Sequence, residues 1–132
     1  MRFVDTSFWV ALQYTKDANH AQAVALWSSD TGPLLMTNLV LGETWTFLRR
    51  RTGHQAALAF LDRVARSPRV EVAHVQPTDE DDAWGWLRRH DERAYSFVDA
   101  TSFVVMRRQR LREALAFDGD FAAAGFSELR PG

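Results

Sequence analysis

Four acidic residues of this 132-residue chain stand at positions where carboxylates could act together: Asp5, Glu43, Asp99 and Asp118. Asp5 follows the apolar pair Phe3-Val4, as a polar residue does at the carboxyl end of a buried strand in a parallel sheet. Ligand and catalytic sites of open α/β sheets lie at that edge. We expect the four acids to meet there. All-oxygen ligands of this kind suit Mg²⁺ or Mn²⁺.

Two of these acids have to be weighed against a purely structural role. Asp5 also suits the N-cap of a following helix, a position that Asp fills readily, but its place at the mouth of a central strand favours a site residue. Glu43 lies in a predicted helix, and a buried carboxylate without a partner is costly. Its neighbours one turn away in either direction are apolar: Leu39, Val40, Phe47 and Leu48. The spacing therefore predicts that Glu43 faces inward or lies at the margin of the buried stripe.

The other two acids follow turn and capping patterns. Asp99 comes three residues after Ser96 and before an apolar run, which resembles a capping box. A carboxylate in the first turn of a buried helix can cap the helix and also bind a metal. Asp118 precedes Gly119, an ordinary turn pair. Because Asp120 is a similar distance from the preceding strand, either Asp118 or Asp120 is a candidate for the fourth carboxylate.

Other sites are not indicated by the sequence. The acidic run 79–82 is interpreted as solvated acids in the first turn of a helix, where the helix dipole favours them. The four histidines lack the paired spacing of a zinc site, and there is no glycine-rich phosphate loop. The chain has no cysteine, which excludes disulfides and thiolate ligands. Carboxylate–metal chemistry remains the best-supported function.

Short apolar segments alternate with helical patterns along the chain. Strands are expected at 3–4, 34–36, 70–75, 113–117 and 126–129. Helices are expected to begin near residues 6, 19, 38, 54, 77 and 96, with a helical turn over 120–124. This alternation with short connections predicts a three-layer α/β/α sandwich around a mostly parallel sheet. We expect one domain over 1–132, with 70–75 nearer an edge of the sheet.

Composition limits the partners. The chain is 46% hydrophobic and 25% charged, with a net charge of −1, so its overall charge neither favours nor excludes nucleic acid. It has no apolar run that could span a bilayer and no export leader, so we expect a cytoplasmic protein without membrane contact. Every basic residue except Lys16 is Arg. Either the coding genome favours Arg, or the clusters 49–51, 88–89 and 107–108 clamp phosphates.

Four segments together resemble a known family: 3–7, 37–43, 96–103 and 116–121. In order and spacing they are similar to the PIN-domain ribonucleases, and in particular to the VapC toxins of bacterial type II toxin–antitoxin systems. Asp5, Glu43 and Asp99 match the three near-constant acids of that family, and Asp118 matches the fourth, more variable one. Ala116 departs from the pattern, because many members have Thr or Ser there.

The resemblance implies a metal-dependent endoribonuclease that hydrolyses RNA phosphodiester bonds. Asp5, Glu43, Asp99 and Asp118 would be both its catalytic residues and its ligands for Mg²⁺ or Mn²⁺, with one ion or two. It also implies a small cognate antitoxin and a homodimer. Three alternatives to this function are considered. They are a PIN-domain nuclease of RNA processing, an inactive PIN-fold binding module and a receiver-like domain, the last disfavoured because Lys16 is the only lysine.

Overall fold

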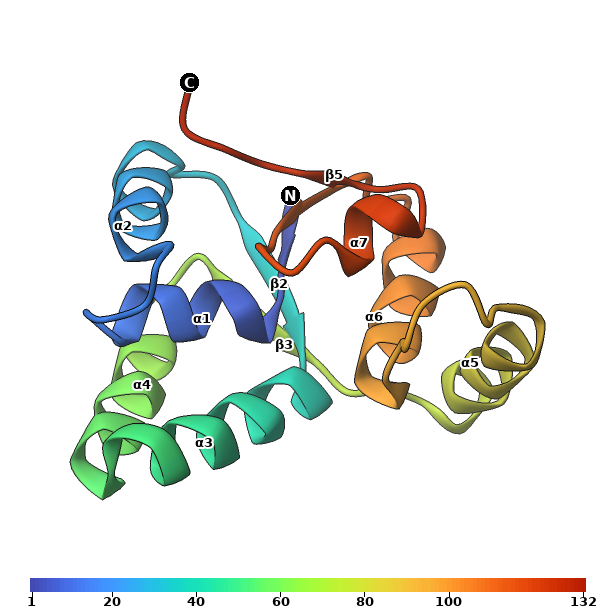
Figure 1. Ribbon diagram of the computed structural model, residues 1–132, viewed down its shortest axis with the longest axis horizontal. Helices are drawn as coiled ribbons and strands as arrows, with labels where there is room; N and C mark the ends of the chain where they lie inside the picture. The colour runs from blue at the N-terminus through green and yellow to red at the C-terminus, as the bar shows by residue number, and fades with distance from the viewer.

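A five-stranded parallel sheet forms the middle of the computed structural model, which describes residues 1–132 (Figure 1). Its strands are β1 (Arg2–Val4), β2 (Leu34–Thr37), β3 (Val70–Ala73), β4 (Glu113–Leu115) and β5 (Ser127–Glu128). Their order across the sheet is β3-β2-β1-β4-β5, and every neighbouring pair is parallel. The first strand of the chain is therefore the central one, with the 70–73 strand at one edge, as expected.

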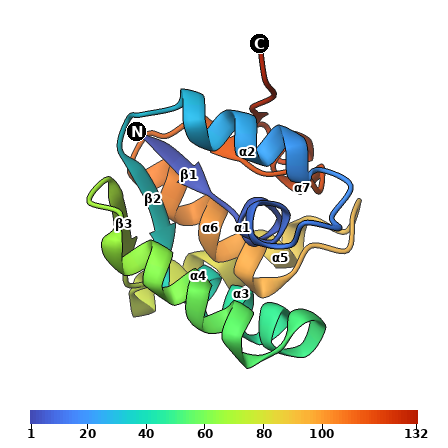
Figure 2. The ribbon, with the colours of Figure 1, turned by 90° about the vertical axis from the view of Figure 1, so that its left-hand side faces the viewer.

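Seven helices cover the two faces of this sheet. They are α1 (Thr6–Gln13), α2 (His20–Ser29), α3 (Asn38–Thr52), α4 (His54–Arg66), α5 (Pro77–Arg89), α6 (Phe97–Arg108) and α7 (Asp120–Ala123). Helices α1 to α4 lie on one side of the strands, and α5 to α7 lie on the other (Figures 1 and 2). The predicted α/β sandwich is confirmed. No helix combines the length and the hydropathy needed to cross a bilayer.

Aromatic packing holds the central strand β1 and the helix α1 that follows it. Phe3 and Val4 of β1 are fully buried. The ring of Trp9, in α1, packs against that of Phe60, in α4, with centroids 5.4 Å apart. On the other side, Phe3 packs against Phe121 at 5.9 Å. Burying side chains of this size stabilises the fold by about 2–3 kcal/mol each, so the carboxyl end of β1 is rigidly held.

Three strands are shorter than the sequence predicts. The predicted strand 126–129 is reduced to Ser127–Glu128, and each of the other two ends where its neighbour becomes a helix. The predicted strand 113–117 ends at Leu115, because its partner β1 gives way to α1, and the N–H of Phe117 donates to Ser7 Oγ (2.9 Å). The predicted strand 70–75 ends at Ala73, opposite the last residue of β2. Beyond it, the N–H of Val75 donates to the side chain of Asn38 (2.8 Å).

One member of the acidic run 79–82 is not solvated. Asp79 is buried, and its carboxylate accepts two hydrogen bonds from Arg108, from Nε (3.1 Å) and Nη2 (3.0 Å). It also accepts the N–H of Gln76 (3.0 Å) and so caps α5. The interpretation of all four acids as solvated is therefore wrong for Asp79, because a basic partner from α6 lies across from it. The acids at 81 and 82 are exposed.

We predict that Asp79→Ala lowers the free energy of unfolding by about 1–3 kcal/mol, since it removes a buried carboxylate that joins α5 to α6 and caps a helix. Urea unfolding measures the change. Asp82→Ala, in the first turns of the same helix but exposed, is the matched control and should stay within about 0.5 kcal/mol of the unmodified protein. Equal stability of the two variants would contradict a structural role for the pair.

Candidate active site

Three carboxylates meet at the carboxyl edge of the sheet. Asp5, Asp99 and Asp118 each offer an oxygen, and these three atoms lie within 4.8 Å of one another. Asp5 follows β1, and Asp118 follows the adjacent parallel strand β4, so both emerge at the same edge. Asp99 comes from the first turn of α6, which begins beside them. The fold thus brings together three of the four predicted acids.

Each of these carboxylates uses one oxygen for a local hydrogen bond. Asp5 Oδ2 accepts the N–H (3.1 Å) and the hydroxyl (2.7 Å) of Ser7, and so caps α1. Asp99 Oδ2 accepts the N–H of Ser96 (2.9 Å) in a capping box. Asp118 Oδ1 accepts the N–H of Asp120 (3.0 Å). No backbone N–H, hydroxyl or basic side chain donates to the second oxygen of any of the three acids. Capping and a shared site are therefore compatible in the same side chains.

The electrostatics of this cluster oppose full ionisation. Burial raises the pKa of Asp99 to about 6. Burial, followed by the charge of Asp118, raises the pKa of Asp5 well above its ordinary value. The pKa of Asp118 is also raised, first by burial and then by nearby acids. A group that is both desolvated and close to like charges favours its neutral form, so the three acids need a cation to be ionised together.

The donor set fits a hard divalent cation. The cluster lies in a hollow of about 520 Å³ that no Arg, Lys or His lines. Its lining includes the three clustered acids together with Asp17, Glu43 and Asp120. Carboxylate oxygens left free by their own hydrogen bonds are the ligands that Mg²⁺ and Mn²⁺ prefer. Asp5, Asp99 and Asp118 are the residues that would hold such an ion.

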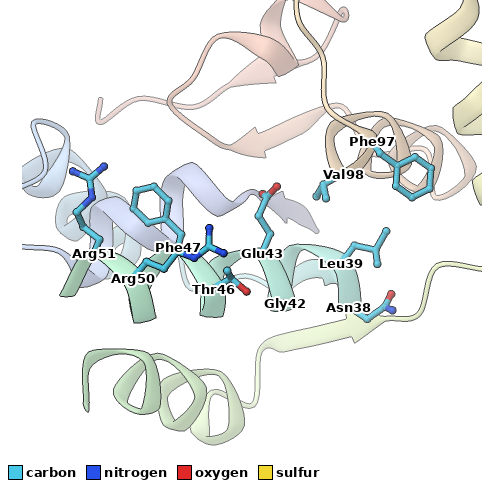
Figure 3. Close-up of a pocket in the computed structure, with 10 residues that line it drawn as sticks. All are labelled: Asn38, Leu39, Gly42, Glu43, Thr46, Phe47, Arg50, Arg51, Phe97 and Val98. Carbon is cyan, nitrogen blue, oxygen red and sulfur yellow. The ribbon is translucent and has the colours of Figure 1, made fainter. Parts of the chain in front are cut away.

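Glu43 lies at the margin of the site and does not face the core. The buried residues of α3 are Val40, Thr44 and Leu48, of which Val40 and Leu48 belong to the apolar stripe that the sequence suggested. Glu43 is exposed, and it lines the acidic hollow without belonging to the group of three close carboxylates. Figure 3 shows its side chain projecting from α3 alongside Phe47. Of the two positions predicted for Glu43, the structure shows the one at the margin of the buried stripe, because this face of α3 is not covered by another element.

Asp120 differs from Asp118 in having a basic partner. Its Oδ1 accepts a hydrogen bond from Arg93 Nε at 2.9 Å, and it lies outside the three-acid cluster. Between them, Gly119 adopts a φ of 83°, in the left-handed region that favours glycine. A Cβ at this position would stand 3.3 Å from Arg93 Nη2. The geometry thus turns Asp118 toward the cluster and Asp120 toward Arg93.

Two further residues hold the cluster in place and were not identified from the sequence. Ser7 donates to Asp5 and accepts the N–H of Phe117, so it joins the ends of β1 and β4. Glu128 of β5 accepts the N–H groups of Gly119 (3.2 Å) and Ala122 (3.0 Å), which fixes the loop after Asp118. A hydroxyl two residues after Asp5 was a usable signal for Ser7. No local pattern marks Glu128.

Comparison with known proteins identifies the family. The family model of the PIN domain matches residues 2–127, and the chain belongs to the PIN domain family. PIN nucleases use a divalent metal, in agreement with the carboxylate cluster. The prediction of a PIN-domain ribonuclease of the VapC toxin class is confirmed by this match together with the relatives described next.

The chain is similar over its whole length to a named endonuclease. It is 56% identical over 131 residues to the 23S rRNA-specific endonuclease VapC20 of two Mycobacterium tuberculosis strains, CDC 1551 / Oshkosh and H37Rv, with 99% of each chain covered. It also matches the crystal structure of M. tuberculosis VapC20, described as a sarcin-ricin loop cleaving toxin. That match has a TM-score of 0.94 and 56% identity, and it covers 99% of this chain and all of that one.

We predict that Glu128→Ala lowers nuclease activity about 10- to 100-fold, because the loop that carries Asp118 loses two hydrogen bonds. The free energy of unfolding of this variant should be about 1–2 kcal/mol lower than that of the unmodified protein. RNA cleavage and urea unfolding measure the two effects. Glu128→Gln retains an acceptor oxygen and should recover most of the activity. Full activity in the Ala variant would show that the loop does not need this residue.

We predict that, without metal, the protein loses stability as the pH rises from about 4 to about 6. In this window the folded state keeps a proton on Asp99 that the unfolded chain has lost. Because the folded state then binds more protons, the free energy of unfolding falls with rising pH. Asp99→Asn lacks this titration, so its melting temperature in chelator should exceed that of the unmodified protein at pH 7 by several degrees.

Divalent ion provides the second half of this test. At pH 7, Mg²⁺ or Mn²⁺ should raise the melting temperature of the unmodified protein, because an ion that binds only the folded state stabilises it. The same ion should raise the melting temperature of the Asp99→Asn variant much less. Identical shifts in the two proteins would mean that Asp99 is not a ligand.

Proposed function

We propose that this chain is an endoribonuclease toxin that cuts 23S rRNA within the sarcin-ricin loop. The target is taken from the names of its relatives, which share 56% of its residues over nearly the full length of both chains. The observation that carries the proposed chemistry is the close approach of Asp5, Asp99 and Asp118 at the carboxyl edge of the sheet. An inactive binding module would have no need of three acids held against their mutual repulsion.

We assign Asp5, Asp99 and Asp118 as ligands of Mg²⁺ or Mn²⁺ and Glu43 as an auxiliary catalytic residue. When bound, the ion would lower the pKa of the attacking water and neutralise charge on the phosphate. The carboxylate of Glu43 makes no hydrogen bond and lines the same hollow, so it is free to orient that water or to accept its proton. The water oxygen bonds to phosphorus, the bond to the leaving ribose oxygen breaks, and that oxygen takes up a proton.

The partners follow from membership in the toxin class. We propose a small cognate antitoxin that binds this chain, and a homodimer as the toxin's own assembly. A toxin that acts on ribosomal RNA would work in the cytoplasm, as the sequence led us to expect. One domain over 1–132 also stays our proposal, and it is supported by a hydrophobic core that is shared by helices from both sides of the sheet.

The proposal is tested with a transcript that contains the sarcin-ricin loop. The unmodified protein should cut it once, with Mg²⁺ or Mn²⁺ and not with chelator. Asp5→Asn, Asp99→Asn and Asp118→Asn should each reduce the rate at least about 100-fold. Asp120→Asn should lose less, because Asp120 is paired with Arg93. Circular dichroism shows whether each variant is folded.

Two controls separate the parts of this proposal. Asp82→Asn changes an exposed acid on α5 and should leave the rate unchanged. A transcript with a scrambled loop should resist cleavage. If both transcripts are cut at equal rates, the sarcin-ricin loop is not the specific target, but the proposed nuclease activity stands. Full activity in a folded Asp99→Asn variant would overturn the assignment of the site.

A further inference from the structure

A second hollow continues the acidic one along α3. It measures about 740 Å³, and Glu43 and Phe47 line both hollows. We call the second hollow the α3 groove. Its lining comes from α3 and from the start of α6: Asn38, Leu39, Gly42, Glu43, Thr46, Phe47, Arg50, Arg51, Phe97 and Val98. Figure 3 shows the side chains of α3 on one side of this space and those of Phe97 and Val98 on the other. A ligand that extends from the acidic hollow past Glu43 and Phe47 therefore enters the α3 groove.

The charge of the lining changes sign from one hollow to the other. The acidic hollow has six carboxylates and no basic side chain in its lining. The α3 groove has one carboxylate, Glu43, and two arginines, Arg50 and Arg51. An anionic strand that reaches the three-acid cluster is therefore attracted on this side. Arginine also suits phosphate because its planar guanidinium donates two parallel hydrogen bonds.

An aromatic ring lies between Glu43 and Arg51 along α3 (Figure 3). Glu43, Phe47 and Arg51 are four residues apart, so they form one stripe along α3 with steps of about 6 Å. Phe47 is 38% exposed, although it belongs to the apolar set of its helix. The guanidinium carbon of Arg51 lies 5.2 Å from the centre of its ring. The stripe thus presents a carboxylate, then a partly exposed aromatic ring, then a cation.

The other two arginine clusters lie away from both hollows. Arg108 is paired with the buried Asp79. Arg107 lies over the ring of Phe126 at 5.1 Å, and burial lowers its pKa. The arginines at 88–89 line neither hollow. Of the three clusters in the sequence, only the one at the end of α3 lines the groove that adjoins the acidic hollow.

We propose that the α3 groove holds the RNA strand next to the cleaved phosphate. An unpaired nucleobase stacks on Phe47, and the adjoining phosphates lie on Arg50 and Arg51. This inference rests on the proposed function and deepens it, because it names the residues that bind substrate beyond the reacting bond. Proteins that bind single strands combine an aromatic stacking surface with a basic groove in this way.

The test measures RNA binding apart from cleavage. All variants are made in the Asp99→Asn protein, which should not cut, and binding of a labelled sarcin-ricin loop RNA is followed by fluorescence anisotropy. Phe47→Leu keeps an apolar side chain but no ring, and it should weaken binding at least about fivefold. Phe47→Trp restores a ring and should bind within about twofold of the parent. Equal binding by the Leu and parent proteins overturns the proposal.

The arginines have a matched control on the same helix. Arg50→Ala and Arg51→Ala should each weaken binding and reduce the slope of log affinity against log salt by about 1. Arg49 is exposed in the same turn but lines neither hollow, so Arg49→Ala should change neither quantity. If Arg49→Ala weakens binding as much as the other two, the effect is one of overall charge and the groove is not the path of the strand.

An RNA with single abasic nucleotides identifies the stacked base. At one position near the cut, removal of the base should abolish the difference between the parent and Phe47→Leu. If no position does so, the stacking contact is refuted. If Phe47→Leu instead binds RNA normally but loses self-association, or loses binding to a co-encoded small protein, the groove belongs to that partner and the proposal fails. If the unmodified protein neither binds nor cuts RNA, the proposed function itself fails.

Discussion

Mutual repulsion among three carboxylates is the constraint around which this structure is built. Asp5, Asp99 and Asp118 lie so close together that, in a desolvated site, their ionised forms repel one another strongly. They are held there by donors that belong to the scaffold: the hydroxyl of Ser7, the backbone of the α6 cap and the loop braced by Glu128. Each acid is thus part of the local structure and of the site at once, and a rigid core beneath β1 resists any outward relaxation.

The parts of the site that could be predicted are those that depend on topology. Asp5 and Asp118 follow apolar runs, and in a parallel sheet the ends of adjacent strands converge. Asp99 was recognisable from its capping pattern before an apolar helix. The fold class followed from the alternation of short strands with helical periods, because each strand is followed by a crossover that returns the chain to the same edge.

The parts that could not be predicted depend on what lies across from a residue. Helical spacing shows that Glu43 shares a face with Leu39 and Phe47, but not that this face is left uncovered. Asp79 looked like its acidic neighbours until α6 placed Arg108 beside it. Glu128 acts on a loop that precedes it in the chain, through a contact between β5 and α7 that no local pattern encodes. In each case the missing information was a tertiary neighbour.

The topology also fixes the order in which the site can assemble during synthesis. The central strand β1 is made first, whereas its partner β4 and the brace on β5 are made near the end of the described chain. The hydrogen bond between Ser7 and Phe117 cannot form until Phe117, which lies 110 positions later, has been made. A growing chain therefore displays Asp5 for most of its synthesis without the loop that completes the cluster, and contacts so distant in sequence form late. A nuclease built in this way cannot complete its carboxylate cluster until its last strands have been made.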